Sequence, residues 1–74
     1  MRTEINESPE ELEKLLKEHR ESHVHERLQT LYLIKARHFT ITAVAQALGK
    51  HRAIIQRWLA EYREEGGLTA LLDQ

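Results

Sequence analysis

The run from Thr40 to Tyr62 constrains the fold more than any other part of this sequence. Its apolar residues recur at the spacing of two amphipathic helices, and Gly49 stands between them. Glycine adopts a positive φ at little steric cost, so Gly49 suits a tight turn, and the small Ala45 suits a close helix crossing. Residues 40–62 therefore have the layout of a helix-turn-helix, whose second helix is shaped to lie in a DNA major groove.

The second of these helices has two chemically different faces. Its inward face is expected to carry an i, i+3, i+4, i+7 set: Ile55, Trp58, Leu59 and Tyr62. Its outward face, near the start of the helix, carries Arg52, Ala53, Gln56 and Arg57. Arginine donates two hydrogen bonds to guanine, glutamine pairs with adenine, and alanine can touch a thymine methyl group. We expect Arg52 and Gln56 to contact bases, Arg57 to contact a base or a phosphate, and Ala53 to leave room for close approach.

A second group of polar residues is expected to meet the DNA backbone. Lys50, His51 and Thr42 lie at the starts of the two helices, where backbone N–H groups also favour phosphate. Thr40 is the expected N-cap of the first helix and belongs to the same edge. The alternative for each of these residues is a solvated surface position with no ligand.

A further helix is predicted near the N-terminus. Ser8 is placed as its N-cap, Pro9 as its first residue and Glu11 as the partner that closes a capping box. This helix runs over about residues 9–20. Its narrow apolar stripe consists of Leu12, Leu15 and Leu16. The stripe must pack either on its own domain or on another chain, and the pattern allows both.

The remaining segments complete an all-α fold. Ser22 is expected to cap a central helix over about residues 23–37, and Phe39 to plug the core after it. The helix-turn-helix then contributes helices at about 41–48 and 52–65, and Gly66 and Gly67 are expected to end the second of them. The predicted architecture is a homeodomain-like three-helix core, with an extra N-terminal helix and a short C-terminal helical turn. Residues 1–7 are expected to be a flexible N-terminus, and residues 8–74 a single helical DNA-binding domain.

Charge is distributed unevenly along the chain, although the net charge is only −1. Residues 1–26 hold eight Glu against four Lys or Arg, whereas residues 27–60 hold six Lys or Arg and no Asp or Glu. The six cations are Arg27, Lys35, Arg37, Lys50, Arg52 and Arg57. Because the acid-free block coincides with the helix-turn-helix, it predicts a local positive field there.

Other classes of function find little support in the residues. The 74-residue chain has no cysteine, hence no disulfide or thiolate zinc site, and no glycine-rich phosphate loop. His19, His23 and His25 are expected to be solvated rather than metal ligands. We expect no catalytic residue, no cofactor, no metal and no small-molecule substrate. No apolar run approaches the ~20 residues of a membrane span, so we expect no membrane partner and a soluble, cytoplasmic protein associated with the nucleoid.

The pattern LG-x-H-R…QRWL-x-x-YRE-x-GL-x-x-LL, from Leu48 to Leu72, resembles the N-terminal domain of bacterial insertion-sequence transposases of the mariner-related superfamily. In that family this domain recognises the terminal inverted repeats of a mobile element, and a separate downstream domain cuts and joins DNA. The resemblance implies that Arg52, Gln56 and Arg57 lie on the recognition helix. It also implies binding without catalysis, because the chain stops before such a domain.

This sequence departs from the family at two places. The family often has Glu where Ala43 stands here, so Thr40 lacks its capping-box partner. The positions of Ala53 and Ile54 are frequently polar in the family, and their apolar character here argues against polar base contacts.

Two alternatives to transposon-end binding stay open from the sequence. One is a small transcriptional regulator, and the other is a protein-interaction or dimerisation module that has lost DNA binding. A homodimer is also expected, since one helix-turn-helix reads only a few base pairs. The candidate interface is the stripe of Leu12, Leu15 and Leu16, together with exposed parts of the helix predicted over residues 23–37.

Overall fold

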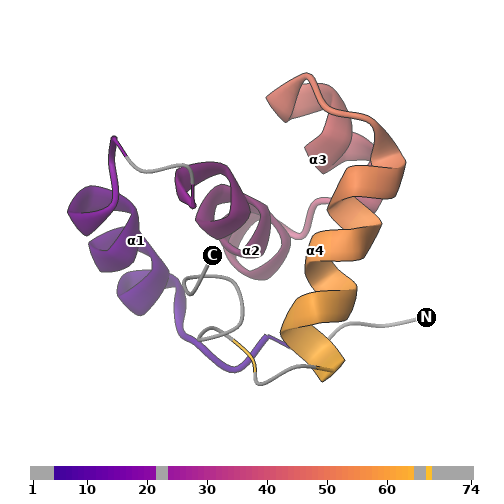
Figure 1. Cartoon of the computed structure of the whole chain (residues 1–74). Coiled ribbons are helices and arrows are strands. Elements are labelled where there is room, and N and C mark those ends of the chain that lie inside the picture. The colour runs from indigo at the N-terminus through magenta and orange to yellow at the C-terminus, as the bar shows by residue number, and fades with distance from the viewer. Residues whose placement is uncertain (1–4, 22–23, 65–66, 68–74) are drawn as a thin grey trace.

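Four helices follow one another in the computed structural model, which describes residues 5–21, 24–64 and 67 (Figure 1). They are α1 (Pro9–Glu18), α2 (His25–Arg37), α3 (Ile41–Leu48) and α4 (Arg52–Glu64). α1 packs on α2, α2 also contacts α3, and α3 contacts α4. The fold is all-α, as the sequence predicts, with α2, α3 and α4 as a helix-turn-helix core to which α1 is added.

The start of α1 follows the predicted capping chemistry with one difference. The Ser8 hydroxyl accepts a hydrogen bond from the backbone N–H of Glu11 at 3.2 Å, and Pro9 is the first helical residue. In a full capping box the Glu11 carboxylate would accept from the Ser8 backbone N–H, but here it accepts from the Ser8 hydroxyl at 3.3 Å. α1 ends at Glu18, before the predicted end near residue 20.

The second helix begins later than its sequence suggests. α2 starts at His25, and its N-cap position is Val24, so the expected start at residue 23 under a Ser22 cap is corrected. Ser22 itself lies outside the described residues. Val24 is only 2% exposed, and its carbonyl accepts from Leu28 N–H at 3.0 Å. The apolar side chain of Val24 is thus buried at the start of the helix.

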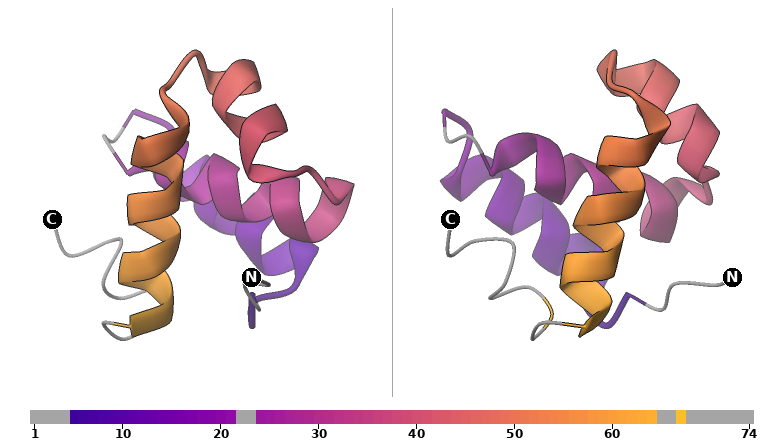
Figure 2. Two further views of the ribbon diagram at one scale, coloured as in Figure 1. Left: turned by 90° about the vertical axis from the view of Figure 1, so that its right-hand side faces the viewer. Right: turned by 45° about the vertical axis from the view of Figure 1, so that its right-hand side comes forward.

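The turn between α3 and α4 depends on the backbone conformation of Gly49. Its φ of 67° is in the left-handed region, and Lys50 N–H donates to Ala45 O at 2.9 Å across the turn. A Cβ atom built on Gly49 meets nothing within 4 Å, so the requirement for glycine is conformational and not one of space. Figure 2 shows how this turn joins α3 to α4 at one end of the molecule.

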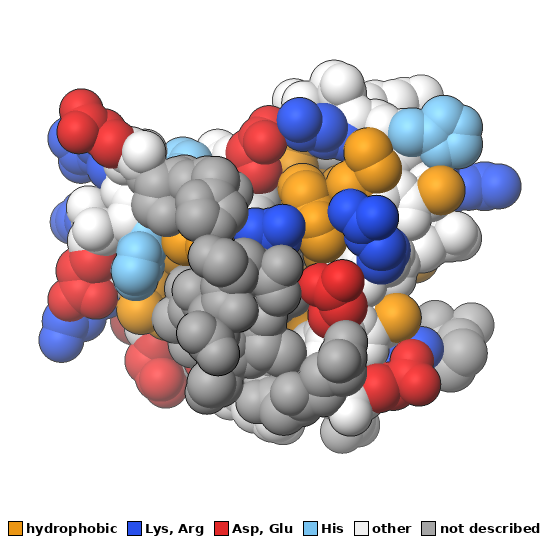
Figure 3. All heavy atoms as spheres, viewed as in Figure 1, with side chains coloured by type: hydrophobic (Ala, Val, Ile, Leu, Met, Phe, Trp, Pro, Cys, Tyr) orange, Lys and Arg blue, Asp and Glu red, His pale blue; other side chains and the backbone are white. Residues whose placement is uncertain are grey.

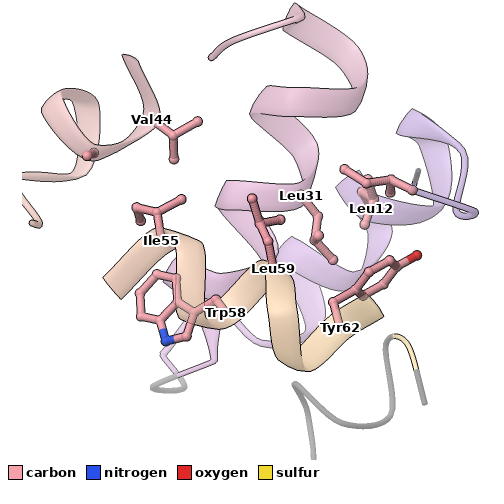
Figure 4. Packing of buried hydrophobic residues seen from close by; sticks show 9 residues of the cluster. Leu12, Leu31, Val44, Ile55, Trp58, Leu59 and Tyr62 are labelled. Carbon is pink, nitrogen blue, oxygen red and sulfur yellow. The ribbon is translucent and has the colours of Figure 1, made fainter. Parts of the chain in front are cut away.

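All four helices contribute to one core (Figure 4). Its most deeply buried members include Leu12 of α1, Leu31 of α2, Val44 of α3 and Ile55 of α4, each with 0% of its surface exposed. Since Leu12 is buried inside its own domain, it is not available as the centre of a dimer interface. The predicted interface is corrected at Leu12, whereas Leu15 and Leu16 are half-buried.

The segment before α1 also packs against the domain. Ile5 is 6% exposed and joins the core, and its carbonyl accepts from the Lys35 ammonium at 2.9 Å. The Tyr62 hydroxyl accepts from Asn6 N–H at 3.0 Å and donates to the Glu7 carboxylate at 2.5 Å. Residues 5–7 thus differ from the flexible N-terminus expected over residues 1–7, because an apolar side chain and three hydrogen bonds anchor them.

α4 extends to Glu64, and Glu65, the last residue of its predicted range, lies outside the described residues. Gly67 has a φ of 69°, and its N–H donates to Tyr62 O at 2.8 Å, which closes the helix end. The predicted C-terminal turn and Gly66 lie outside the described residues. Within the part of the chain that the structure describes, no helix is long and apolar enough to cross a membrane.

Candidate nucleic-acid interface

α4 has one buried face and one exposed face. The buried side chains are Ile55, Trp58, Leu59 and Tyr62, and none of the four is more than 7% exposed. The exposed side chains are Arg52, Ala53, Gln56 and Arg57, which we call the recognition face. The core therefore holds α4 so that two guanidinium groups and one amide point away from the domain. Hydrogen-bond donors and acceptors of this kind can read base edges in a major groove.

His51 has a structural role that its sequence context does not reveal. Its Nδ1 atom accepts a hydrogen bond from Ala53 N–H at 3.1 Å, and its carbonyl accepts from Ile54 N–H at 3.0 Å. His51 therefore caps α4, and only its exposed Nε2 side is left to meet a phosphate. Sequence reasoning assigned it to phosphate alone, since histidine is not among the common N-cap residues.

Thr40 and Thr42 lie at the start of α3 and have different tasks. The Thr40 hydroxyl accepts from Ala43 N–H at 3.1 Å, which confirms it as the N-cap of α3. Thr42 is exposed in the first turn, where its hydroxyl can reach solvent or a backbone phosphate.

Lys50 precedes α4 and is paired with a residue of α2. Its Nζ atom lies 3.3 Å from the Glu26 carboxylate, and both side chains remain more than one third exposed. Glu26 is the last acid before the acid-free block, and it borders the surface on which Lys50 lies. Sequence reasoning missed this pair because its two members are 24 positions apart and no local pattern connects them.

Arg27 supports α4 from the side of α2. Its guanidinium carbon lies 5.4 Å from the centre of the Trp58 ring, an arrangement that favours a cation–π interaction. Arg27 Nε and NH1, with Trp58 Nε1, are buried without a hydrogen-bond partner in the described structure. Arg27 thus acts first through Trp58, which is the largest side chain that fixes the orientation of α4.

A basic surface accompanies the recognition face. Lys50, Arg52 and Arg57 are all exposed, and neither α3 nor the first three quarters of α4 contains an acidic residue. Figure 3 shows basic and apolar side chains lying next to each other on the part of the surface formed by α4 and the turn before it. Arg63 adds a further exposed cation two turns beyond Gln56, which sequence reasoning did not select.

The described part of the chain contains no candidate metal-binding cluster. There, no group of three His, Cys, Asp or Glu side chains is arranged to hold a metal ion. His19 and His25 are half-buried, and His23 lies outside the described residues.

Comparison with known families identifies this arrangement. A family profile described as a homeodomain-like domain matches residues 24–72, roughly two thirds of the chain. No curated protein and no solved structure matches the chain significantly. The matched span begins at Val24, so it includes α2, α3 and α4 but not α1. Homeodomains are helix-turn-helix domains that bind DNA with their third helix in the major groove.

Proposed function

The chain belongs to the homeodomain-like domain family, and from this premise we propose that it binds double-stranded DNA in a sequence-specific manner. One observation supports this most directly. The recognition face is exposed on a helix whose opposite face is buried in the core, and residues 27–60 around it include no Asp or Glu, although Glu26 borders this surface. In the proposed complex α4 lies in the major groove.

Each polar residue has a proposed role in that complex. Arg52 and Gln56 contact base edges, and Arg57 contacts a base or the adjoining phosphate. Lys50 and the Nε2 side of His51 meet the backbone at the start of α4. Thr42 meets it at the start of α3, where Thr40 holds the helix end in place.

The natural target we propose is the terminal inverted repeat of a transposable element. The support is the resemblance of the run from Leu48 to Leu72 to insertion-sequence transposases. The proposed activity is binding alone, without catalysis or a cofactor, on the DNA of the nucleoid. Two copies acting on two half-sites would supply the affinity that one small module lacks, and sedimentation at high protein concentration tests that expectation.

A second candidate is a protein-interaction module that keeps the fold without binding DNA. The exposed apolar Ala53 and the half-exposed Ile54 favour it. A salt series separates the two functions. Binding through several phosphates weakens steeply as salt rises, whereas binding through an apolar interface does not.

The experiment is a fluorescence-anisotropy titration with a random-sequence duplex at several salt concentrations, followed by selection of the preferred site. We expect binding at low salt that falls steeply with added salt, and a consensus site after selection. Absence of binding at low salt would overturn the proposal and turn attention to a protein partner.

A further inference from the structure

The recognition face contains an apolar element that neither phosphate contacts nor polar base contacts use. Ala53 is exposed in the first turn of α4, and Ile54 beside it is half-buried. Exposed cations flank this pair in the sequence: Arg52 comes directly before it, and Arg57 follows about one helical turn later. Figure 3 shows the same mixture of apolar and basic side chains on this part of the surface.

The backbone and the core hold this apolar pair in a fixed position. The N–H groups of Ala53 and Ile54 donate to Nδ1 and O of His51, which anchors the first turn of α4. Ile54 also packs against the hydrophobic core, and its β-branched side chain has few rotamers. A rigid apolar surface discriminates between ligands by shape, since it cannot move aside for a poor fit.

The surrounding charge limits which ligand this surface can take. The exposed cations Arg52 and Arg57, with Lys50, which is also paired with Glu26, favour a polyanion over a neutral apolar peptide. Within a DNA major groove, the apolar group that base pairs present is the C5 methyl of thymine. A duplex with thymine at the right position therefore satisfies the charge and the apolar pair together.

We infer that Ala53 and Ile54 read pyrimidine 5-methyl groups, so that the preferred DNA site contains thymine at the base pairs facing the start of α4. This inference rests on the proposed DNA binding and adds the chemical class of base that the site selects. The neighbouring arginines and Gln56 read hydrogen-bonding groups, whereas this pair reads a methyl group that offers no hydrogen bond.

The test replaces single thymines by deoxyuridine in the selected duplex. This exchange removes one methyl group from the groove and leaves base pairing and backbone charge unchanged. At one or two adjacent positions the Kd should rise about fourfold, the factor equivalent to burial of one methyl group. Thymines outside the protected site are the internal control, and their replacement should leave the Kd unchanged.

Protein variants then assign the effect to the two residues. In Ala53→Ser and Ile54→Asn the ratio between the deoxyuridine and thymine affinities should fall toward one. Ala47→Ser is the control, because Ala47 is also an exposed alanine but lies in α3. This variant should keep the full ratio. Circular dichroism checks that every variant is folded, and the deoxyuridine series on the unaltered protein does not depend on any variant.

The outcomes separate this inference from the proposed function. If the protein binds its selected site but no deoxyuridine replacement changes the Kd, methyl reading is excluded while DNA binding stands. A ratio that persists in both Ala53→Ser and Ile54→Asn also excludes the pair as the reader. If no duplex is bound at low salt, both the inference and the proposed function are overturned.

Discussion

The Nζ atom of Lys50 lies 3.3 Å from Oε1 of Glu26, so the residue just before α4 is tied to the first turn of α2. This pair places a carboxylate at the edge of the proposed DNA-binding surface. A phosphate that approaches Lys50 must compete with that carboxylate and is also repelled by it.

Removal of the carboxylate should therefore strengthen DNA binding. Glu26→Gln is expected to lower the Kd by about two- to fivefold at low salt, the factor for an exposed charge interaction of roughly 0.4–1 kcal/mol. Glu10→Gln, which removes the same charge from the far end of α1, is the matched control and should have little effect on the Kd. Anisotropy titrations of the three proteins measure this. An equal decrease of the Kd in both variants would mean that the net charge of the protein, and not the position of Glu26, determines the effect on DNA binding.

The His51 cap should contribute to the stability of the domain. His51→Ala removes the acceptor for Ala53 N–H and should lower the free energy of unfolding by ~1 kcal/mol. His51→Asn supplies another side-chain acceptor and should recover most of that loss. Urea unfolding followed by circular dichroism compares the variants. The capping role is disproved if Ala and Asn at this position give the same stability.

Trp58 and Arg57 are neighbours on α4 with opposite environments. Trp58→Ala should lower the free energy of unfolding by ~3–5 kcal/mol, a large part of the total for a small domain. Arg57→Ala should change it by less than ~0.5 kcal/mol, because the side chain is exposed, yet it should weaken DNA binding. Thermal unfolding and DNA titration of both variants test the two faces of α4. Normal DNA binding by both would contradict the assignment of the recognition face.

Alkaline pH should destabilise the domain through Tyr62. Burial, together with the hydrogen bond to Glu7, raises the pKa of Tyr62 from its ordinary value of 10.0 to about 12. The folded state therefore favours the neutral form of Tyr62. The stabilisation that this provides is fully present below pH 10 and is lost as the pH rises toward 12. The free energy of unfolding should fall across that window by up to roughly 1 kcal/mol per pH unit.

The comparison that isolates Tyr62 is with two phenylalanine variants. Tyr62→Phe should flatten the alkaline decline seen in urea unfolding. Tyr32→Phe, which removes the other tyrosine and its hydrogen bond to Glu13, should retain that decline. The same alkaline slope in Tyr62→Phe and the unaltered protein would show that another group is responsible.

Local patterns predicted most of the fold. The i, i+3, i+4, i+7 spacing in α4 predicted its buried face. The N-caps Ser8 and Thr40 were also predictable, because each lies three residues from the residue whose N–H it accepts. The positive φ of Gly49 was predictable for the same reason, since a turn residue acts on its own backbone. Such signals depend on neighbours along the chain.

Contacts between distant parts of the chain were not predictable in this way. Ile5 lies in the segment expected to be flexible, but it joins the core, and this segment is hydrogen-bonded to Lys35 of α2 and Tyr62 of α4, which are distant in sequence. The bond from Tyr62 to Glu7 spans 55 positions, and no periodicity marks it. The sequence alone identified the exposed residues of the recognition face. It could not show that Lys50 forms an ion pair with Glu26.

The most direct test of the proposed function compares two charge-matched double variants. Arg52→Ala/Arg57→Ala removes two cations from the recognition face, whereas Lys14→Ala/Lys17→Ala removes two exposed cations from α1. The slope of log K against log salt, measured by anisotropy, reports how many phosphates are neutralised. For the arginine variant we predict weak binding and a slope shallower by up to about 1, because only Arg57 is proposed to reach a phosphate. For the lysine variant we predict unchanged binding and an unchanged slope. Equal behaviour of the two variants would contradict DNA binding through α4.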